Sequence, residues 1–185
     1  DFKYKDKQNN RQYDEIVLNE IIKNFFSNIE TVYELSEEQK VCWVMEKENI
    51  CDAPQQGYMS KDGLHFLFPY IIAEKKTYLK LREYIIECDY HSIFEKANKN
   101  PPSNTMEEIV DESIYKGGNW FIYGSGKPNE EMRYQLTGIK KSSNGSLIDL
   151  PIDMYLDDPL EIIKNNSVVN HTDINVVYKD ELKNQ

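Results

Sequence analysis

Apolar residues recur at helical spacing in two stretches of the chain. In residues 13–33 they stand three or four positions apart, which is the stripe of an amphipathic helix; they are Leu18, Ile22, Phe25, Ile29 and Val32. Asp14 precedes this stripe, so we expect it to cap the helix. The segment "KKTYLKLREYIIEC", residues 75–88, has a similar stripe and predicts a second helix that packs on a sheet.

Two runs between these helices are typical of strands. "KVCWVMEK", residues 40–47, is short and β-rich. "LHFLFPYII", residues 64–72, predicts a strand with both faces at least partly buried, where Pro69 indicates a sheet edge or a bulge. The polar stretch between the two runs contains turn residues and predicts a loop over residues 48–63.

Short apolar runs separated by glycine turns follow, and they predict antiparallel strands rather than helices. These runs are "EEIVDESIY" (107–115), "NWFIYGS" (119–125) and "RYQLTGIKK" (133–141). Asp158 followed by Pro159 predicts a short helix through Ile163, and "INVVY" (174–178) predicts an edge strand. The order helix, strand, strand, helix and then several strands predicts a mixed α+β domain.

Length and composition favour one globular domain over residues 1–185, without internal repeats. We expect a soluble, intracellular protein, because no apolar run reaches the roughly 18 to 20 residues of a membrane span and the first residues are not typical of a signal peptide. Cys42, Cys51 and Cys88 are an odd number without framework spacing, which favours thiols. Cys88 and His91 have a ligand-like gap, but two ligands do not make a zinc site.

The net charge of -10 argues against nucleic-acid binding over the whole surface, because affinity for phosphates comes from cationic side chains. Residues 113–147 differ from the rest of the chain. Their basic residues outnumber Glu130 and Glu131; they are Lys116, Lys127, Arg133, Lys140 and Lys141. A local basic surface on an acidic chain is therefore compatible with the sequence.

The segment "YGSGKP", residues 123–128, contains the glycines and the lysine that phosphate-binding loops use. It is not a Walker loop, because Pro128 follows Lys127 and the first glycine is misplaced. Two interpretations remain, a glycine-rich hairpin turn or a lysine that contacts a phosphate as a point charge. The absence of a G-x-S-x-G motif argues against a serine hydrolase.

His65 and Asp111 are further candidates for chemistry. Taken alone, His65 at the start of an apolar run is more typical of a structural histidine. Asp111 follows the apolar pair Ile109 and Val110, and a carboxylate beside an apolar strand must be solvated, capped or bound to a cation. Two such residues on separate strands would be able to share a site.

The segments "KDGLHFLFPYI" and "IVDESIYKGGNWFIYGSGKP" together resemble the archaeo-eukaryotic primase superfamily. The resemblance is closest to the primase domains of primase-helicases from nucleocytoplasmic large DNA viruses, the group of poxviruses, asfarviruses and mimivirus-like giant viruses. It extends from Asp1 to about Ile139. It implies an α+β fold, the RNA-recognition-motif-like (RRM-like) catalytic half of a primase, with a mixed, largely antiparallel sheet and flanking helices.

The resemblance also implies roles for individual residues. His65 matches the histidine of a Ser-x-His motif that contacts the phosphates of the incoming nucleotide, although Gly63 replaces the serine. Asp111 matches an acidic metal ligand, and Asp1 matches the second carboxylate of an Asp-x-Asp metal motif. We therefore expect the first carboxylate upstream and the chain to be an N-terminally truncated fragment. The residues that match a further nucleotide-binding block are Asn119, Ser125 and Lys127, with Tyr123 beside them.

The function that the resemblance implies is that of a DNA primase, a nucleotidyltransferase that makes primers for viral DNA replication by a two-metal mechanism with Mg²⁺ or Mn²⁺. The implied partners are a single-stranded DNA template, nucleoside triphosphates and a helicase domain in the same parent chain. The implied location is a viral replication compartment in the host cytoplasm or nucleus. Two alternatives remain open, a non-catalytic nucleotide or nucleic-acid binding module and a structural or interaction domain of a virus.

Contacts to a template would come from local basic residues, with aromatic rings as stacking surfaces. The basic candidates are Lys116, Lys140 and Lys141, and the aromatic candidates are Trp120 and Tyr123. Arg82 is a weaker candidate, since an exposed helix face explains it equally well.

Overall fold

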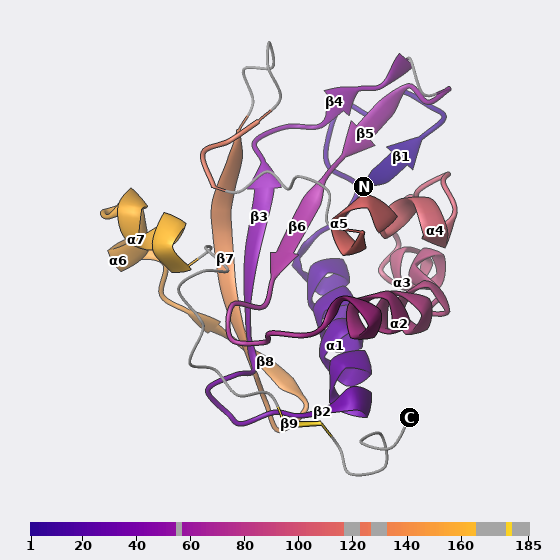
Figure 1. Cartoon of the computed structure of the whole chain (residues 1–185). Helices are drawn as coiled ribbons and strands as arrows, with labels where there is room; N and C mark the ends of the chain where they lie inside the picture. The colour runs from indigo at the N-terminus through magenta and orange to yellow at the C-terminus, as the bar shows by residue number, and fades with distance from the viewer. Residues whose placement is uncertain (55–56, 117–122, 127–132, 166–176, 179–185) are drawn as a thin grey trace.

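The computed structural model describes residues 1–54, 57–116, 123–126, 133–165 and 177–178. Among these residues, a four-stranded antiparallel sheet has the order β6-β3-β7-β8 (Figure 1). Its strands are β6 (Leu64–Leu67), β3 (Val41–Lys47), β7 (Tyr134–Ser143) and β8 (Ser146–Leu150). The strands predicted over residues 40–47 and 133–141 are confirmed. The strand predicted from residue 64 ends at Leu67, before Pro69, and β6 lies at an edge of the sheet as that proline indicated.

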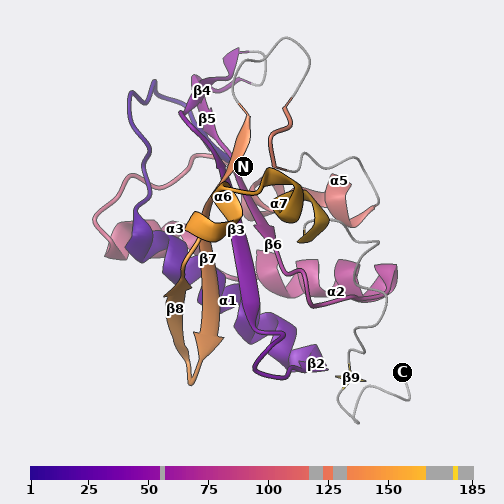
Figure 2. The same cartoon turned by 90° about the vertical axis from the view of Figure 1, so that its left-hand side faces the viewer.

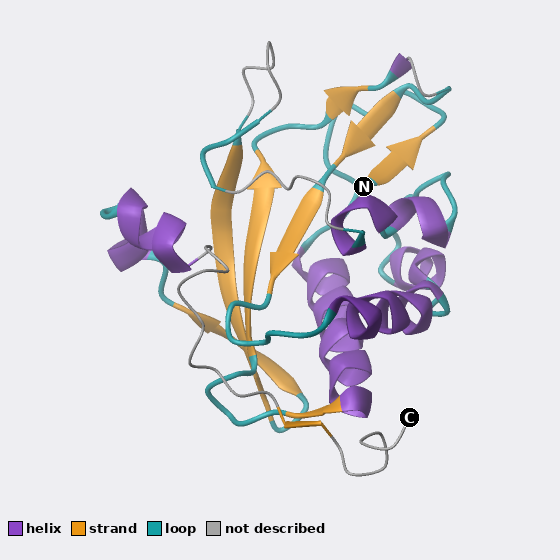
Figure 3. Ribbon diagram, viewed as in Figure 1, coloured by secondary structure: helices purple, strands orange, loops and turns teal. Residues whose placement is uncertain are grey.

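Three helices cover one face of this sheet, α1 (Glu15–Val32), α2 (Lys75–Ile86) and α3 (Tyr90–Lys96) (Figures 1 and 3). Both long helices were predicted from the apolar stripe. The Asp14 side chain accepts hydrogen bonds from the backbone N–H groups of Ile16 and Val17, so the predicted cap is confirmed. The stripe of α1 packs on β3; the buried residues of this contact are Ile22, Phe26, Cys42 and Val44.

The opposite face of the sheet contacts α7 (Pro159–Asn165), which follows the short α6 (Asp153–Leu156) (Figure 2). Ile162 of α7 is fully buried against Trp43, Leu136 and Ile139. The Asp158 carboxylate accepts hydrogen bonds from the N–H groups of residues 160 and 161, which confirms the predicted start of this helix. This face is covered at α7, and the polar site described below lies on the same face.

A small antiparallel sheet of order β1-β5-β4 adjoins the main sheet. Its strands are β1 (Phe2–Tyr4), β5 (Ser60–Asp62) and β4 (Cys51–Asp52). The prediction of a continuous loop over residues 48–63 was therefore wrong. The polar pattern of residues 51–62 conceals the strands, because these strands pair with each other and with the distant β1 rather than form a buried apolar run.

Residues 107–115 form two short helices, α4 (Met106–Ile109) and α5 (Glu112–Tyr115), so the prediction of a strand there was also wrong. Each helix begins at a capping residue. Thr105 and Glu108 form a capping box on α4, and Asp111 caps α5. The predicted strand over 119–125 lies largely outside the described residues.

Two further short strands, β2 (Tyr33–Glu34) and β9 (Val177–Tyr178), pair antiparallel, so the described part of "INVVY" is a strand. Within the described part of the chain, no helix is both long enough and apolar enough to span a bilayer.

Candidate functional site

Polar residues gather where the small sheet meets the main sheet. β5 passes into β6 through the single residue Gly63, and β1 pairs with β5 so that Phe2 lies opposite Asp62. Continuing this register puts Asp1 opposite Gly63. Because successive side chains of a strand point to opposite faces, residues 61, 63 and 65 share one face of the two strands.

Asp1 is held at this junction by three contacts. Its carboxylate forms an ion pair with Lys61, with 2.8 Å between Oδ2 and Nζ. Its backbone nitrogen donates to the carbonyl of Ile109 at 2.8 Å, and its own carbonyl accepts from Nδ2 of the buried Asn104 at 3.0 Å. The carboxylate is therefore fixed next to the segment that carries Asp111.

Asp111 lies between α4 and α5 as an exposed N-cap rather than on a strand. Its Oδ1 accepts from the Ser113 N–H, and its Oδ2 accepts from the Ser113 hydroxyl, both at 2.9 Å. Desolvation by neighbouring groups opposes ionisation, but the two hydrogen bonds from Ser113 and the charge of Lys61 hold the pKa of Asp111 below its ordinary value. Lys61 is thus within electrostatic reach of both Asp1 and Asp111.

His65 is half-buried on β6, opposite Met45 of β3. Its imidazole stacks on the Tyr134 ring with 3.8 Å between ring centroids and 16° between ring planes. The neighbouring residues Leu64 and Phe66 pack toward α1, so the alternation of the strand turns His65 to the opposite face. His65 is therefore on the same face as Lys61 and Gly63. We call Asp1, Lys61, His65 and Asp111 the junction cluster.

Position 63 has little room for a side chain. A Cβ atom built on it would lie 2.8 Å from the Tyr134 hydroxyl and 2.9 Å from Oδ1 of Asp1. A serine in its place would collide with both groups. Glycine in place of the motif serine therefore allows Asp1 and Tyr134 to approach this position closely.

Ser125 is connected to the same region through backbone contacts. The N–H of Tyr134 donates to the Ser125 carbonyl at 3.1 Å, and the N–H of Gly124 donates to the Tyr134 carbonyl at 2.7 Å. Gly124 has a φ of 73°, a backbone conformation that glycine adopts without strain. Asn119, Trp120 and Lys127 lie outside the described residues.

The donor set of the junction is compatible with a hard divalent cation. Asp1 and Asp111 offer carboxylate oxygens, which Mg²⁺ and Mn²⁺ prefer, and Mg²⁺ is commonly held by one or two carboxylates together with substrate phosphates. Asp1 already binds a cationic group, the Lys61 ammonium. Within the described ranges, no cluster of three or more His, Cys, Asp or Glu side chains is arranged to hold a metal ion. Asp1 and Asp111 alone would thus form an open site that substrate oxygens complete.

The sequence patterns did not single out two residues of this region, Lys61 and Tyr134. Lys61 had a detectable signal, because it precedes His65 by four positions in an extended segment and so faces the same way. Tyr134 had none, since its contact with His65 spans two strands that are about seventy residues apart in the chain.

Arg82 has a definite structural role instead of lying on an exposed helix face. Its Nε donates to the carbonyl of Val110 at 3.0 Å, and its Nη2 donates to the carbonyl of Glu107 at 2.9 Å. It therefore connects α2 to the segment directly before Asp111.

Two of the basic residues expected to contact a template are engaged with carboxylates. Lys140 is buried, and its Nζ forms ion pairs with Glu15 at 2.8 Å and Asp149 at 2.5 Å, so the expectation for Lys140 was wrong. The Lys116 ammonium is exposed and forms an ion pair with Glu112 at 2.6 Å. Lys141 is half-buried on β7.

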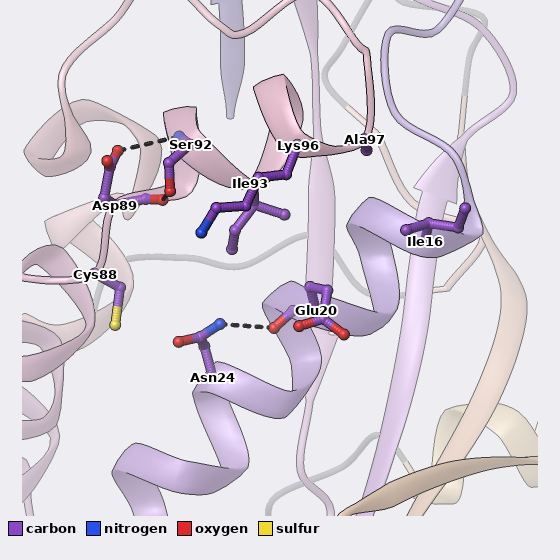
Figure 4. A pocket seen from close by; sticks show the side chains of 9 residues that line it. All are labelled: Ile16, Glu20, Asn24, Cys88, Asp89, Ser92, Ile93, Lys96 and Ala97. Carbon is purple, nitrogen blue, oxygen red and sulfur yellow. Dashed lines mark hydrogen bonds between the residues drawn. The ribbon is translucent and has the colours of Figure 1, made fainter.

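A pocket between α1 and α3 lies apart from the junction cluster (Figure 4). Two of its polar side chains bind the local backbone. Asn24 Nδ2 donates to the Glu20 carbonyl at 2.8 Å, and Asp89 Oδ1 accepts from the Ser92 N–H at 3.2 Å. We assign no function to it.

The chain is thus a mixed α+β domain in which two carboxylates, a lysine and a histidine lie at the junction of two sheets, and its family is an archaeo-eukaryotic primase (AEP) family. Residues 1–140 match the family described as the C962R protein N-terminal AEP domain, and the chain belongs to this family. This confirms the resemblance and the α+β fold inferred from the sequence.

A protein of Acanthamoeba polyphaga mimivirus named "Putative helicase L207/L206" is 29% identical over 173 residues, which cover 92% of this chain. The chain spans only 17% of the length of that relative. No solved structure matches the chain.

Proposed function

We propose that this domain is the catalytic primase domain of a viral primase-helicase and transfers nucleotides onto a primer under the direction of a single-stranded DNA template. The observation that carries the proposal is the convergence of Asp1, Asp111, Lys61 and His65 at one junction, within a chain of the AEP family. The helicase name of the mimivirus relative, which is much longer than this chain, supports a helicase domain in the same protein.

The proposed reaction is the attack of a hydroxyl oxygen on the α-phosphate of a nucleoside triphosphate, with pyrophosphate leaving. Mg²⁺ or Mn²⁺ bound at the carboxylates would activate the attacking oxygen and neutralise the leaving oxygens. Asp1 and Asp111 provide the carboxylates, and an acidic residue two positions before Asp1 would complete the pair that the family pattern expects. The depressed pKa of Asp111 keeps this carboxylate ionised at neutral pH.

Lys61 and His65 are suited to bind the triphosphate. Both lie on the face that Asp1 occupies, and a lysine or imidazolium that donates to phosphate oxygens stabilises the charge of the leaving pyrophosphate. When the triphosphate binds, Lys61 would exchange its contact with Asp1 for a contact with a phosphate. We also propose that Asn119, Ser125 and Lys127 bind the nucleotide. Primer synthesis of this kind would take place in a viral replication compartment of the host.

The principal test is a template-dependent synthesis assay on single-stranded DNA with nucleoside triphosphates and Mn²⁺, using the full-length protein that contains this domain. We expect primers from the parent, and a loss of at least about a hundredfold in His65→Ala and Asp111→Asn. Lys23→Gln, on the exposed part of α1, is the matched control and should retain the parent's rate. Parent-like synthesis by both site variants would show that the site assignment is wrong.

The same samples distinguish the two alternatives. A non-catalytic binding module would bind nucleotide and Mn²⁺ without making primers. A structural or interaction domain would show no change in Tm with either ligand.

A further inference from the structure

The Tyr134 side chain lies at the centre of the junction, although neither the family motifs nor the sequence patterns assign it a role. A Cβ on Gly63 would lie 2.8 Å from the Tyr134 hydroxyl oxygen and 2.9 Å from Oδ1 of Asp1. The hydroxyl and the carboxylate thus both approach Gly63 closely, which the absence of a side chain at this position permits. A phenol hydroxyl has one donor and two acceptor positions, so it can serve a ligand in addition to a protein partner.

The ring of Tyr134 faces the proposed phosphate-binding imidazole. The rings of His65 and Tyr134 are nearly parallel, at 16°, with 3.8 Å between their centroids. This stacking restricts the rotation of the imidazole about χ2, which otherwise has broad minima. The Lys47 ammonium lies over the Tyr134 ring, 5.7 Å from its centre.

The position of Tyr134 is fixed by backbone contacts on both sides. It lies at the start of β7 opposite Lys47 of β3, and its N–H and carbonyl both bond to the turn at Gly124 and Ser125. The residue is only 5% exposed, so packing also restricts its ring. A rigid hydroxyl next to a metal-binding carboxylate is well placed for a phosphate oxygen.

We infer that Tyr134 is a nucleotide-binding residue whose hydroxyl contacts the triphosphate beside Asp1 and whose ring fixes the plane of the His65 imidazole, an inference that rests on the proposed function. Gly63 makes this possible, because a side chain there would crowd both the Tyr134 hydroxyl and the Asp1 carboxylate. The contact adds binding energy to the triphosphate both before and during transfer. It therefore lowers KM and leaves kcat nearly unchanged.

The test uses the full-length protein, a fluorescent non-hydrolysable nucleoside triphosphate with Mn²⁺, and steady-state synthesis. Tyr134→Phe keeps the ring and its stacking but removes the hydroxyl, so it should fold with a parent-like Tm. We expect its Kd for the triphosphate and its KM to rise about tenfold, as for a lost hydrogen bond to a charged group, with little change in kcat. Tyr155→Phe, beside Trp43 and away from the cluster, is the matched control and should bind as the parent does.

A double variant provides an independent readout. Without the Tyr134 hydroxyl, the nearest atom of that ring to a Cβ at position 63 is Cζ at 3.8 Å, an ordinary contact. Gly63→Ser should therefore weaken binding more in the parent than in the Tyr134→Phe background, where only the close approach to Oδ1 of Asp1 at 2.9 Å remains. A Tyr134→Phe variant that binds the triphosphate as tightly as the parent would overturn this inference but not the proposed function. A parent that binds no triphosphate in the presence of Mn²⁺ would overturn both the inference and the proposed function.

Discussion

The two faces of β5 carry two clusters of charged residues with opposite properties. On the face toward α1, Asp62 is fully buried and binds Arg11, whose Nε lies 2.8 Å from Oδ2. We call the group around it the Arg11 cluster; its members are Arg11, Tyr13, Glu46, Asp62 and Thr137. On the other face, the junction cluster is partly exposed, and the side chains of Asp1 and Lys61 are 25% and 20% accessible.

The Arg11 cluster satisfies its own charges. Arg11 donates to Asp62, to Glu46 and to the Lys47 carbonyl, and the Tyr13 hydroxyl donates to Glu46 at 2.6 Å. In the junction cluster, the Asp111 carboxylate is exposed and accepts hydrogen bonds from the backbone N–H and the hydroxyl of Ser113. A carboxylate inside the protein that is paired with a protein cation is already occupied, whereas one open to solvent is available to a metal ion.

The largest effect is expected from removing one charge of the junction cluster. Asp111→Asn retains an N-cap for α5, because asparagine caps helices about as well as aspartate. It should lower primer synthesis about 10³-fold, which corresponds to about 4 kcal/mol, while the free energy of unfolding hardly changes. Synthesis rates and urea denaturation measure the two quantities. The control is Asp52→Asn on β4, an exposed acid of the small sheet. It should change neither the synthesis rate nor the free energy of unfolding.

The next effect concerns the fold. Arg11→Met leaves two buried carboxylates without their cation and should reduce the free energy of unfolding by about 3 kcal/mol. Urea denaturation measures it. Lys7→Met, which breaks the exposed pair with Asp52, should cost less than about 1 kcal/mol. Equal losses in the two variants would contradict the distinction between a buried cluster and an exposed pair.

A smaller effect is expected for Arg82, which connects α2 to the backbone before Asp111. Arg82→Ala should displace Asp111 and lower kcat about tenfold, because small displacements of catalytic groups are costly. Metal affinity, measured by Mn²⁺ titration, should fall as well, and Arg82→Lys should recover part of the loss. A decrease in stability with unchanged Mn²⁺ affinity would show that Arg82 has no role in positioning Asp111.

The smallest effect concerns the pH dependence of stability. As the pH rises, Asp62 in the Arg11 cluster and Asp111 in the junction cluster should change the free energy of unfolding in opposite directions. Burial raises the pKa of Asp62 above its ordinary 3.8 despite the opposing charge of Arg11, so its contribution to stability is present at low pH and is lost as the pH rises above about 4. The pKa of Asp111 is depressed below 3.8, so its contribution is present above about pH 4 and is lost as the pH falls.

Unfolding free energies measured between pH 2.5 and 6, values chosen as roughly bracketing ordinary carboxyl pKa values, test this difference. Asp62→Asn should change the slope above about pH 4, and Asp111→Asn should change it below about pH 4. If both substitutions changed the slope in the same pH range, the assignment of opposite environments to Asp62 and Asp111 would be wrong.

The sequence by itself determined the amphipathic helices, the central strands and two of the candidate site residues, His65 and Asp111. The stripe of α1 with its Asp14 cap is local information, because helical spacing and an N-cap are both read within one turn. The central strand β3 is β-rich and buried along its whole length, so its composition indicated its place. The family motifs identified His65 and Asp111 from residue identity and spacing alone.

Only the tertiary structure decided which of these residues meet. The pairing of β1 with β5 places Asp1 opposite Gly63, and the stacking of Tyr134 on His65 joins strands about seventy residues apart. In the α4–α5 segment the local pattern was insufficient to predict the secondary structure. Its apolar residues suggested a strand, but the segment forms two short helices that begin at capping residues. Hydrogen-bond partners and burial depend on contacts across the chain, and these contacts make Asp62 a structural acid and leave Asp111 open to a cation.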